Sequence, residues 1–387
     1  MQQIIYGVDR FIEQAAKYKQ LKFGLITNNA ANTSTGVSSR VALLKSGINV
    51  LQLFSPEHGL SAKGEDGGFQ KNFTDEITGL PVISLYGEKL KPTAEDLKEL
   101  DALLFDIPDA GCRYYTYLWT MSYAMEAAAE NQKQFFVLDR PNPAGGKLTF
   151  AEGPMLDEEN CSSFIGRWNV PVRHCCTLGE LAQYFAATKI KNAGLQIIKT
   201  ANWKRMKEPD LMHKNFIAPS PALTDAATIL LYSGLGFLEG INVNEGRGTA
   251  TPFKILGAPW INENELQEAF TSLHITGIQS FPECYIPNSG LHAQKECKGI
   301  RFSITDSENF KPVATGLQIL QLLINLYPVD CKERLYPTVA NPTGENHLDR
   351  LTGIKNSFEK IKSGNFFNEK FWDGRQWESV IKPYLLY

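Results

Sequence analysis

Carboxylate side chains that follow apolar runs are the first candidates for chemistry in this sequence. Glu57 comes directly after the apolar run 50–54 and lies between Pro56 and Gly59, in a loop type that can hold a side chain at the edge of a sheet. An isolated loop glutamate is more often a solvated acid or a helix cap. Glu57 is favoured as a functional residue because further acids and Arg140 are expected at the same edge.

A tyrosine-rich segment follows another apolar run. Residues 105–117 carry two aspartates, one arginine and three tyrosines, namely Asp106, Asp109, Arg113, Tyr114, Tyr115 and Tyr117. Acids and arginine can hydrogen-bond to sugar hydroxyls, and aromatic rings pack on the apolar faces of sugar rings. The segment therefore predicts a carbohydrate site. The competing interpretation makes Tyr114 and Tyr117 core residues of the next helix.

A second polar cluster lies in the glycine-rich stretch 239–249, which contains Asn244 and Arg247. Acids, amides and arginine in such a loop suit a pocket for a polar ligand, neutral or anionic. For Glu245, a ligand role and a structural pairing with a buried arginine are equally good interpretations. For Glu239 the structural pairing is favoured.

The elements that would position these residues alternate between strand-like and helical patterns. Continuous apolar runs occur at 23–27, 50–54, 82–86, 102–106 and 135–139, and helical patterns occur at 9–19, 36–46, 93–99 and 116–131. Continuous runs predict strands covered on both faces, hence a Rossmann-like, mostly parallel α/β sheet with helices on both faces. Ligands bind beyond the carboxyl ends of such strands. Asn28, Asp139 and Asn142 should therefore join Glu57 and Asp106 at one edge.

The remainder of the 387-residue chain predicts a second, smaller domain. A strand at 170–173, a helix at 177–186 and a strand at 195–200 continue the first pattern, and after about residue 235 come glycine-rich loops, short strands near 299–304, and helices at 263–271, 313–326 and 371–386. We expect a Rossmann-like domain over 1–235 and a smaller α+β domain over 236–387 that completes a cleft.

Composition and missing motifs exclude several classes of function. The net charge is −3 and no long basic run occurs, so no nucleic-acid partner is expected. No apolar stretch approaches the ~20 residues that span a bilayer. The sequence has neither G-x-G-x-x-G nor G-x-x-x-x-G-K-[ST], so a nucleotide cofactor is not expected, and Gly64-Glu65-Asp66-Gly67-Gly68 would repel phosphate. The six histidines are scattered, which argues against a metal site.

The cysteines and the N-terminus bear on the compartment. Seven cysteines form an odd set without C-x-x-C spacing, which argues against a disulfide framework and for a reducing compartment. The first residues show neither a basic nor an apolar signal region. We expect a cytoplasmic protein as the chain stands, or a periplasmic or secreted one if a signal peptide has been removed.

Five motifs occur in a recognisable order along nearly the whole chain. They are Ser55-Pro56-Glu57-His58-Gly59, Thr78-Gly79-Leu80-Pro81-Val82, Asp106 to Tyr117, Asp139-Arg140-Pro141-Asn142-Pro143 and Asn244-Glu245-Gly246-Arg247-Gly248-Thr249. With them the sequence resembles the exo-β-N-acetylmuramidase family of the NamZ type, formerly a domain of unknown function. One departure is Pro108, where the resemblance leads us to expect glutamine. The resemblance implies removal of terminal β-linked N-acetylmuramic acid from the non-reducing end of peptidoglycan fragments.

The resemblance also implies roles for single residues. It makes Glu57 the leading catalytic acid, which would protonate the leaving group. The second group remains open between Asp106, Asp109, Glu245 and the substrate's own acetamido group, and so does the choice between retention and inversion.

The expected substrate is the disaccharide MurNAc-GlcNAc or a muropeptide, with no metal or cofactor. Its binding residues would be Asn28, His58, Tyr86, Arg113, Tyr115, Tyr117, Asp139, Arg140, Asn142, Asn244 and Arg247. The three arginines in this set are candidates for the lactyl carboxylate, because a guanidinium can contact a carboxylate with two hydrogen bonds. The alternative function is a non-catalytic muropeptide-binding protein on the same fold.

Overall fold

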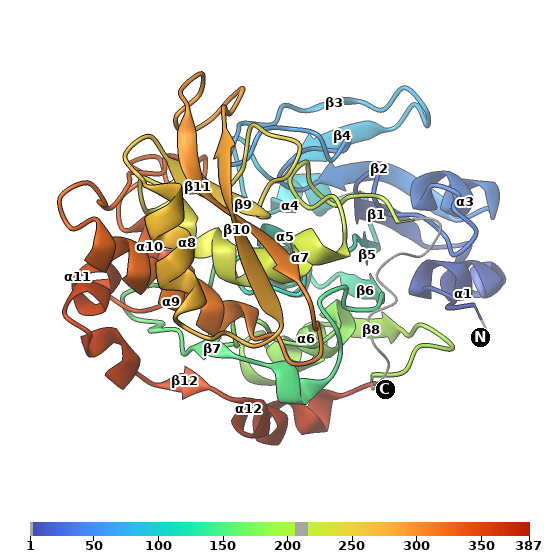
Figure 1. Cartoon of the computed structure of the whole chain (residues 1–387). Helices are drawn as coiled ribbons and strands as arrows, with labels where there is room; N and C mark the ends of the chain where they lie inside the picture. Colours follow the sequence, from blue (N-terminus) through green and yellow to red (C-terminus); the bar gives the residue numbers. More distant parts are fainter. Residues whose placement is uncertain (1–2, 206–215) are drawn as a thin grey trace.

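A seven-stranded sheet organises the first half of the chain (Figure 1). The computed structural model describes residues 3–205 and 216–387; His213, one of the six histidines, lies outside them. The strands are β1 (Lys22–Thr27), β2 (Asn49–Ser55), β3 (Phe73–Thr74), β4 (Pro81–Ser84), β5 (Ala102–Asp106), β6 (Gln134–Leu138) and β8 (Leu195–Ile198). Their order is β3-β4-β2-β1-β5-β6-β8, and only β3 runs antiparallel to its neighbour. The predicted mostly parallel sheet is confirmed.

Helices cover both faces of this sheet. On one face, α1 (Gly7–Glu13) and α3 (Ser39–Lys45) bury side chains in a cluster with β1, β2 and β6. On the other face, α5 (Thr116–Glu130) and α6 (Leu178–Thr188) contribute to a larger core. The short helices are α2 (Ala15–Tyr18) and α4 (Ala94–Leu97). All five residues of β5 are buried, as expected for a continuous apolar run with helices on both sides.

The topology of the sheet predicts where a ligand would bind. From β1, the chain builds outward through β2 and β4 in one direction, and from β5 through β6 and β8 in the other. The switch point therefore lies between β1 and β5, and a crevice opens beyond the carboxyl ends of the strands there. Asn28 follows β1 directly, and Glu57 lies two residues beyond the end of β2. The fold thus brings Glu57 close to the switch point.

The second half forms a smaller domain, as predicted, around an antiparallel sheet. Its strands are β9 (Ile255–Ala258), β10 (Ile278–Tyr285) and β11 (Cys297–Ile304), in the order β10-β11-β9. Its helices are α7 (Ala226–Leu235), α8 (Glu263–Thr271), α9 (Pro312–Leu326), α10 (His347–Thr352), α11 (Ser357–Lys362) and α12 (Gly374–Ile381). Short 3-10 helices occur at η1 (Leu148–Phe150), η2 (Gly236–Gly240), η3 (Asn365–Asn368) and η4 (Lys382–Tyr384).

Two glycines allow helices of the second half to pack closely. Gly234 lies in α7 and Gly316 in α9. A Cβ on Gly234 would lie 1.9 Å from the carbonyl oxygen of Pro312, and one on Gly316 would lie 2.2 Å from the carbonyl oxygen of Gly234. Only hydrogen at both positions permits this backbone contact. The glycine-rich character of this stretch suggested loops, but Gly234 lies in a helix, because close packing and not a turn requires this glycine.

Two predicted elements differ from the structure. Residues 170–173 form no strand; Arg173 makes only isolated bridges to Cys112 and Glu152, since Pro171 lacks the N–H that a ladder needs. The C-terminal helix predicted at 371–386 begins later, at Gly374, because Asp373 caps it with side-chain hydrogen bonds to the N–H groups of Arg375 and Gln376.

The C-terminal segment packs back onto the first half of the chain (Figure 1). Strand β12 (Phe371–Trp372) pairs with β7 (Gly153–Pro154). The indole N–H of Trp377 then donates to the carbonyl of His174 at 2.8 Å. Within the described parts of the chain, no helix has the length and apolar character needed to cross a bilayer.

Candidate active site

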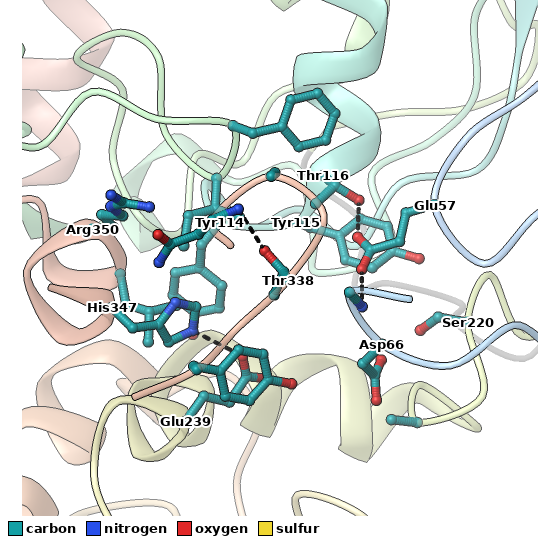
Figure 2. Close-up of a pocket in the computed structure, with 18 of the residues that line it drawn as sticks. Glu57, Asp66, Tyr114, Tyr115, Thr116, Ser220, Glu239, Thr338, His347 and Arg350 are labelled. Atoms are coloured by element: carbon teal, nitrogen blue, oxygen red, sulfur yellow. Dashed lines mark hydrogen bonds and ion pairs between the residues drawn. The ribbon is translucent and has the colours of Figure 1, made fainter. Parts of the chain in front are cut away.

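A cavity of about 700 Å³ is lined by residues from both halves of the chain. The first half contributes Glu57, His58, Asp66, Tyr86, Tyr115 and Thr116. The second half contributes Arg247 and Tyr336, together with Glu239, Thr338, His347 and Arg350, which are labelled in Figure 2. Five of the residues predicted to be catalytic or to bind substrate therefore line one cavity: Glu57, His58, Tyr86, Tyr115 and Arg247.

The carboxyl group of Glu57 is held by two donors. Oε1 accepts a hydrogen bond from the backbone N–H of Gly67 at 2.6 Å, and Oε2 accepts one from the hydroxyl of Thr116 at 2.7 Å. Thr116 is the first residue of α5, so this helix fixes the direction of the carboxyl group. Glu57 is only 8% exposed, yet it lines the cavity. It is a pre-oriented acid in a largely dehydrated site.

Buried side chains form hydrogen bonds that hold the backbone at Glu57 in place. The hydroxyl of Tyr117 lies 2.6 Å from the carbonyl oxygen of Pro219 and 3.3 Å from that of Glu57. The amide of Asn28 donates to the Tyr117 hydroxyl at 3.1 Å. Both side chains are fully buried. Asn28 and Tyr117 therefore position the Glu57 loop, and neither belongs to the described lining of the cavity.

Arg247 joins the two halves of the site through carboxylates. Its Nε lies 2.6 Å from Asp66 Oδ2, and its Nη1 lies 2.6 Å from Glu239 Oε1 and 3.0 Å from Glu245 Oε1. The guanidinium also packs over the ring of Phe253, 4.8 Å from its centroid. Three carboxylates thus surround one cation, and Arg247 links Asp66 of the first half to two acids of the second.

Glu239 carries a charge at the base of the cavity. Burial acts to raise the pKa of its carboxyl, but Arg247 and His347 outweigh this effect and lower the pKa to about 2. His347 Nε2 lies 3.6 Å from Glu239 Oε2, and the imidazole stacks on Tyr336 with ring centroids 4.4 Å apart. The pairing of Glu239 with an arginine agrees with the interpretation favoured from sequence, although Glu239 also lines the cavity.

Asp106 and Arg140 are paired with each other instead of facing the cavity. Arg140 Nε lies 2.6 Å from Asp106 Oδ1, and Arg140 Nη2 lies 3.0 Å from Oδ2. Asp106 is completely buried. Because β5 and β6 are adjacent, the residues at their carboxyl ends meet directly. Neither residue is among the described lining of the cavity, so the structure gives them a structural pairing.

Other predicted site residues also lie apart from this cavity. Asp109, Asp139, Arg140 and Asn142 line a separate space of about 270 Å³ near the end of β6. Asp109 Oδ2 lies 3.3 Å from His174 Nε2. Asp139 accepts hydrogen bonds from Thr177 and Gly179 at the start of α6. Asn142 donates to the carbonyl of Cys176 at 2.9 Å. These contacts hold loops together.

Arg113 and Asn244 are likewise engaged within the protein. Arg113 is fully buried, and its guanidinium donates to the backbone carbonyls of Pro154, Val170, Leu351 and Thr352. The side chain of Asn244 donates to the carbonyls of Arg247 and Leu291 and accepts from Tyr285. Both expectations of ligand contact are replaced by structural roles, because buried hydrogen-bonding groups must be satisfied.

Glu245 lies at a second, neighbouring cavity. This space of about 1200 Å³ is lined by Glu245, Gly248, Ser289 and Arg334, among others. It shares Asp66, Ala222, Arg247 and Tyr336 with the first cavity. The two cavities therefore adjoin at these residues.

Several residues of the cavity were not predicted from the sequence. Asp66 and Gly67 belong to a glycine-rich segment that was weighed only as a phosphate loop; its position shortly after Glu57 was the available signal. Tyr336, His347 and Arg350 come from loops and the short helix α10, where no periodic pattern predicts a common face. No group of His, Cys, Asp or Glu side chains in the described ranges could hold a metal ion.

Comparisons with known proteins place the chain in one family. The family models described as "Exo-beta-N-acetylmuramidase NamZ" match residues 23–227 (N-terminal) and 230–387 (C-terminal). A relative from Bacillus subtilis (strain 168), named peptidoglycan beta-N-acetylmuramidase NamZ, is 38% identical over 98% of this chain and 91% of its own length.

Solved structures have the same fold. A crystal structure of a DUF1343 family protein from Bacteroides fragilis NCTC 9343 matches with a TM-score of 0.87 and 30% identity, over 100% of this chain and 99% of that one. A second DUF1343 protein of the same strain matches with a TM-score of 0.72 and 25% identity, over the same shares. The chain belongs to the exo-β-N-acetylmuramidase NamZ family.

Proposed function

We propose that this protein is an exo-acting glycoside hydrolase that releases terminal β-linked N-acetylmuramic acid from peptidoglycan fragments. The observation that carries the proposal is the carboxyl group of Glu57, oriented by Gly67 and Thr116 inside a cavity between the two halves of the chain. Family membership supports the same reaction. A cavity lined from both halves of the chain, with several polar side chains in it, suits the terminal sugar of such a fragment.

In the proposed reaction, Glu57 is the general acid. Its proton passes to the glycosidic oxygen while the bond between that oxygen and the anomeric carbon breaks. Water then supplies a hydroxyl to the anomeric carbon, and its proton replaces the one that was given up. The hydroxyl of Thr116 can donate or accept, so it can stay bonded to Glu57 in both protonation states.

We propose Asp66 as the second carboxylate. It lines the same cavity as Glu57, whereas Asp106 is completely buried and is not among the described lining of that cavity. Figure 2 shows the side chains of Asp66 and Glu57 on the same side of the cavity. The Asp66→Asn variant should lose hydrolysis and still bind the disaccharide by calorimetry. Unchanged hydrolysis in that variant would contradict the assignment.

We propose that the larger neighbouring cavity receives the leaving group. It adjoins the first cavity at Asp66 and Arg247 and is lined by polar groups that suit sugar hydroxyls or a peptide stem. The physiological substrate would then be a soluble MurNAc-GlcNAc disaccharide or muropeptide. The seven cysteines are all unpaired, which supports action in a reducing compartment such as the cytoplasm.

The proposal is tested by incubating the protein with MurNAc-GlcNAc and following the products by mass spectrometry. The expected result is free N-acetylmuramic acid and N-acetylglucosamine. The isomeric disaccharide GlcNAc-MurNAc, whose non-reducing end is N-acetylglucosamine instead of N-acetylmuramic acid, should remain intact. If MurNAc-GlcNAc raises Tm but is not cleaved, the protein is a muropeptide-binding protein and the enzymatic proposal fails.

A further inference from the structure

The cations predicted to bind the substrate carboxylate are all used within the protein. Arg113 donates to four backbone carbonyls, Arg140 is paired with Asp106, and Arg247 is shared by three carboxylates. N-acetylmuramic acid differs from N-acetylglucosamine by a lactyl ether that ends in a carboxylate. A site selective for muramic acid therefore needs another cation.

Arg350 meets this need. It belongs to α10 and lines the main cavity, and its side chain is partly exposed. Within residues 3–205 and 216–387, no hydrogen bond, ion pair or ring contact engages its guanidinium. The preceding Asp349 is occupied, because its carboxylate accepts hydrogen bonds from the N–H groups of Asn356 and Ser357. Arg350 thus offers an uncompensated planar fork to the cavity.

The charges of the cavity leave one favourable place for an anion. Its carboxylates are Glu57, Asp66 and Glu239, and each already has donors within the protein. Arg350 lies across the cavity from Glu57 and Asp66 in Figure 2. A substrate carboxylate would be repelled by the acids at the Glu57 side and attracted at the Arg350 side.

The shape of the sugar agrees with this separation. The bond that breaks is at the anomeric carbon, and the lactyl ether leaves the ring two carbons away. With the anomeric oxygen at Glu57, the lactyl ether leaves the ring away from the breaking bond, so its carboxylate can reach toward the Arg350 side of the cavity. The helix there is fixed to the first half of the chain by Arg113, which donates to the carbonyls of Leu351 and Thr352.

We propose that Arg350 binds the lactyl carboxylate of the terminal N-acetylmuramic acid and so determines selectivity for muramic acid. This inference rests on the proposed function and adds the residue that recognises the substrate. Arg113 does not contact the substrate in this proposal. It is a positioning residue, because its hydrogen bonds hold α10.

The experiment compares two chromogenic substrates that differ only at the lactyl group. One is 4-nitrophenyl N-acetyl-β-muramide, and the other is the same compound with the carboxylate converted to its primary amide. A hydrogen bond to a charged group corresponds to roughly 10- to 100-fold in kcat/KM. In the wild type, kcat/KM for the carboxylate substrate should exceed kcat/KM for the amide by that factor. In Arg350→Met the ratio of the two values should fall to nearly one.

Two further variants control the result. Arg350→Lys keeps the charge and should retain part of the preference, whereas Arg375→Met, an exposed arginine of α12, should keep the wild-type ratio. An unchanged preference in Arg350→Met overturns the inference. If Arg350→Met does not fold, Arg350→Gln replaces it. If the wild type itself hydrolyses the carboxylate and the amide substrates with equal kcat/KM, the inference is overturned without any variant.

The proposed function can fail independently of Arg350. If the wild type hydrolyses neither substrate, the enzymatic proposal is rejected, and calorimetry with free N-acetylmuramic acid and N-acetylglucosamine then tests Arg350 by itself. The wild type should bind N-acetylmuramic acid more tightly than N-acetylglucosamine, and Arg350→Met should bind the two sugars with equal affinity. Equal affinities in the wild type would overturn the inference.

Discussion

At the scale of single residues, the site depends on how Glu57 is oriented. One oxygen of its carboxyl group is fixed by a backbone N–H and the other by the hydroxyl of Thr116. The backbone contact is insensitive to side-chain substitution, but the hydroxyl contact is not. Thr116 is therefore a positioning residue that can be removed without touching the acid.

Thr116→Val should lower kcat on MurNAc-GlcNAc, whose leaving sugar needs a proton from Glu57, about tenfold or more and change KM little. Valine keeps the volume of threonine but leaves one oxygen of Glu57 without a partner, and the loss of such a contact is worth about 1.5 kcal/mol or more. Thr116→Ser restores the hydroxyl and should recover most of kcat. Equal kcat values for valine and threonine would show that this contact does not orient Glu57.

The sequence predicted the position of Glu57 but not its partners. Glu57 was expected at the sheet edge because a buried strand precedes it, and the structure has it there. The same reasoning placed Asp106 and Arg140 at this edge, where they pair with each other. Strand ends indicate which edge a residue occupies, but not the direction of its side chain. Arg350 could not be predicted, because it is brought to the site by packing of a six-residue helix.

At the scale of elements, Asp139 connects the end of β6 to the start of α6. Its carboxyl accepts hydrogen bonds from Thr177, Gly179 and Tyr387. Burial nevertheless raises its pKa from 3.8 to about 6. The folded state therefore holds this proton more tightly than the unfolded state does, and the contribution of Asp139 to stability falls as pH rises from about 4 to 6.

Asp139→Asn should remove this pH dependence. An amide has the shape of the protonated acid and no charge to bury. The free energy of unfolding of the variant, relative to that of the wild type, should therefore rise by roughly 2 kcal/mol between pH 4 and pH 7. Urea unfolding at both pH values measures the difference. A difference between variant and wild type that is independent of pH would contradict the raised pKa.

The elements of the first half were predicted well because each is long and strongly patterned. Continuous apolar runs gave the central strands to within one or two residues. The second half was harder. Strand β10 contains Pro282 and has mostly exposed or half-exposed side chains, so its pattern resembles a loop. Residues 371–372 pair with β7, which lies more than 200 residues earlier in the sequence. No local sequence pattern reveals such a contact.

At the scale of the whole molecule, the two sequence domains share one core. A single cluster of buried side chains includes Trp119 of α5, Leu317 of α9 and Trp377 of α12. Arg113 bonds across the halves to α10, and β12 pairs with β7. The cavity therefore lies within a joined body, and its two sides are held in register without a ligand.

Differential scanning calorimetry of the full chain should show one cooperative unfolding transition, with calorimetric and van't Hoff enthalpies in agreement. The shared core makes it unfavourable for either half to unfold first. Two resolved transitions would show that the halves are independent, and the cavity between them would then be free to open.

The proposed hydrolysis depends on the proton of Glu57, and the most direct test is Glu57→Gln. Glutamine can still accept from the N–H of Gly67 and donate to the hydroxyl of Thr116, so Tm should hardly change, but it has no proton to give to the glycosidic oxygen. Release of N-acetylmuramic acid from MurNAc-GlcNAc should fall by about 10²- to 10⁴-fold, while Glu88→Gln, an exposed glutamate, should match the wild type. Wild-type turnover in Glu57→Gln would contradict the account.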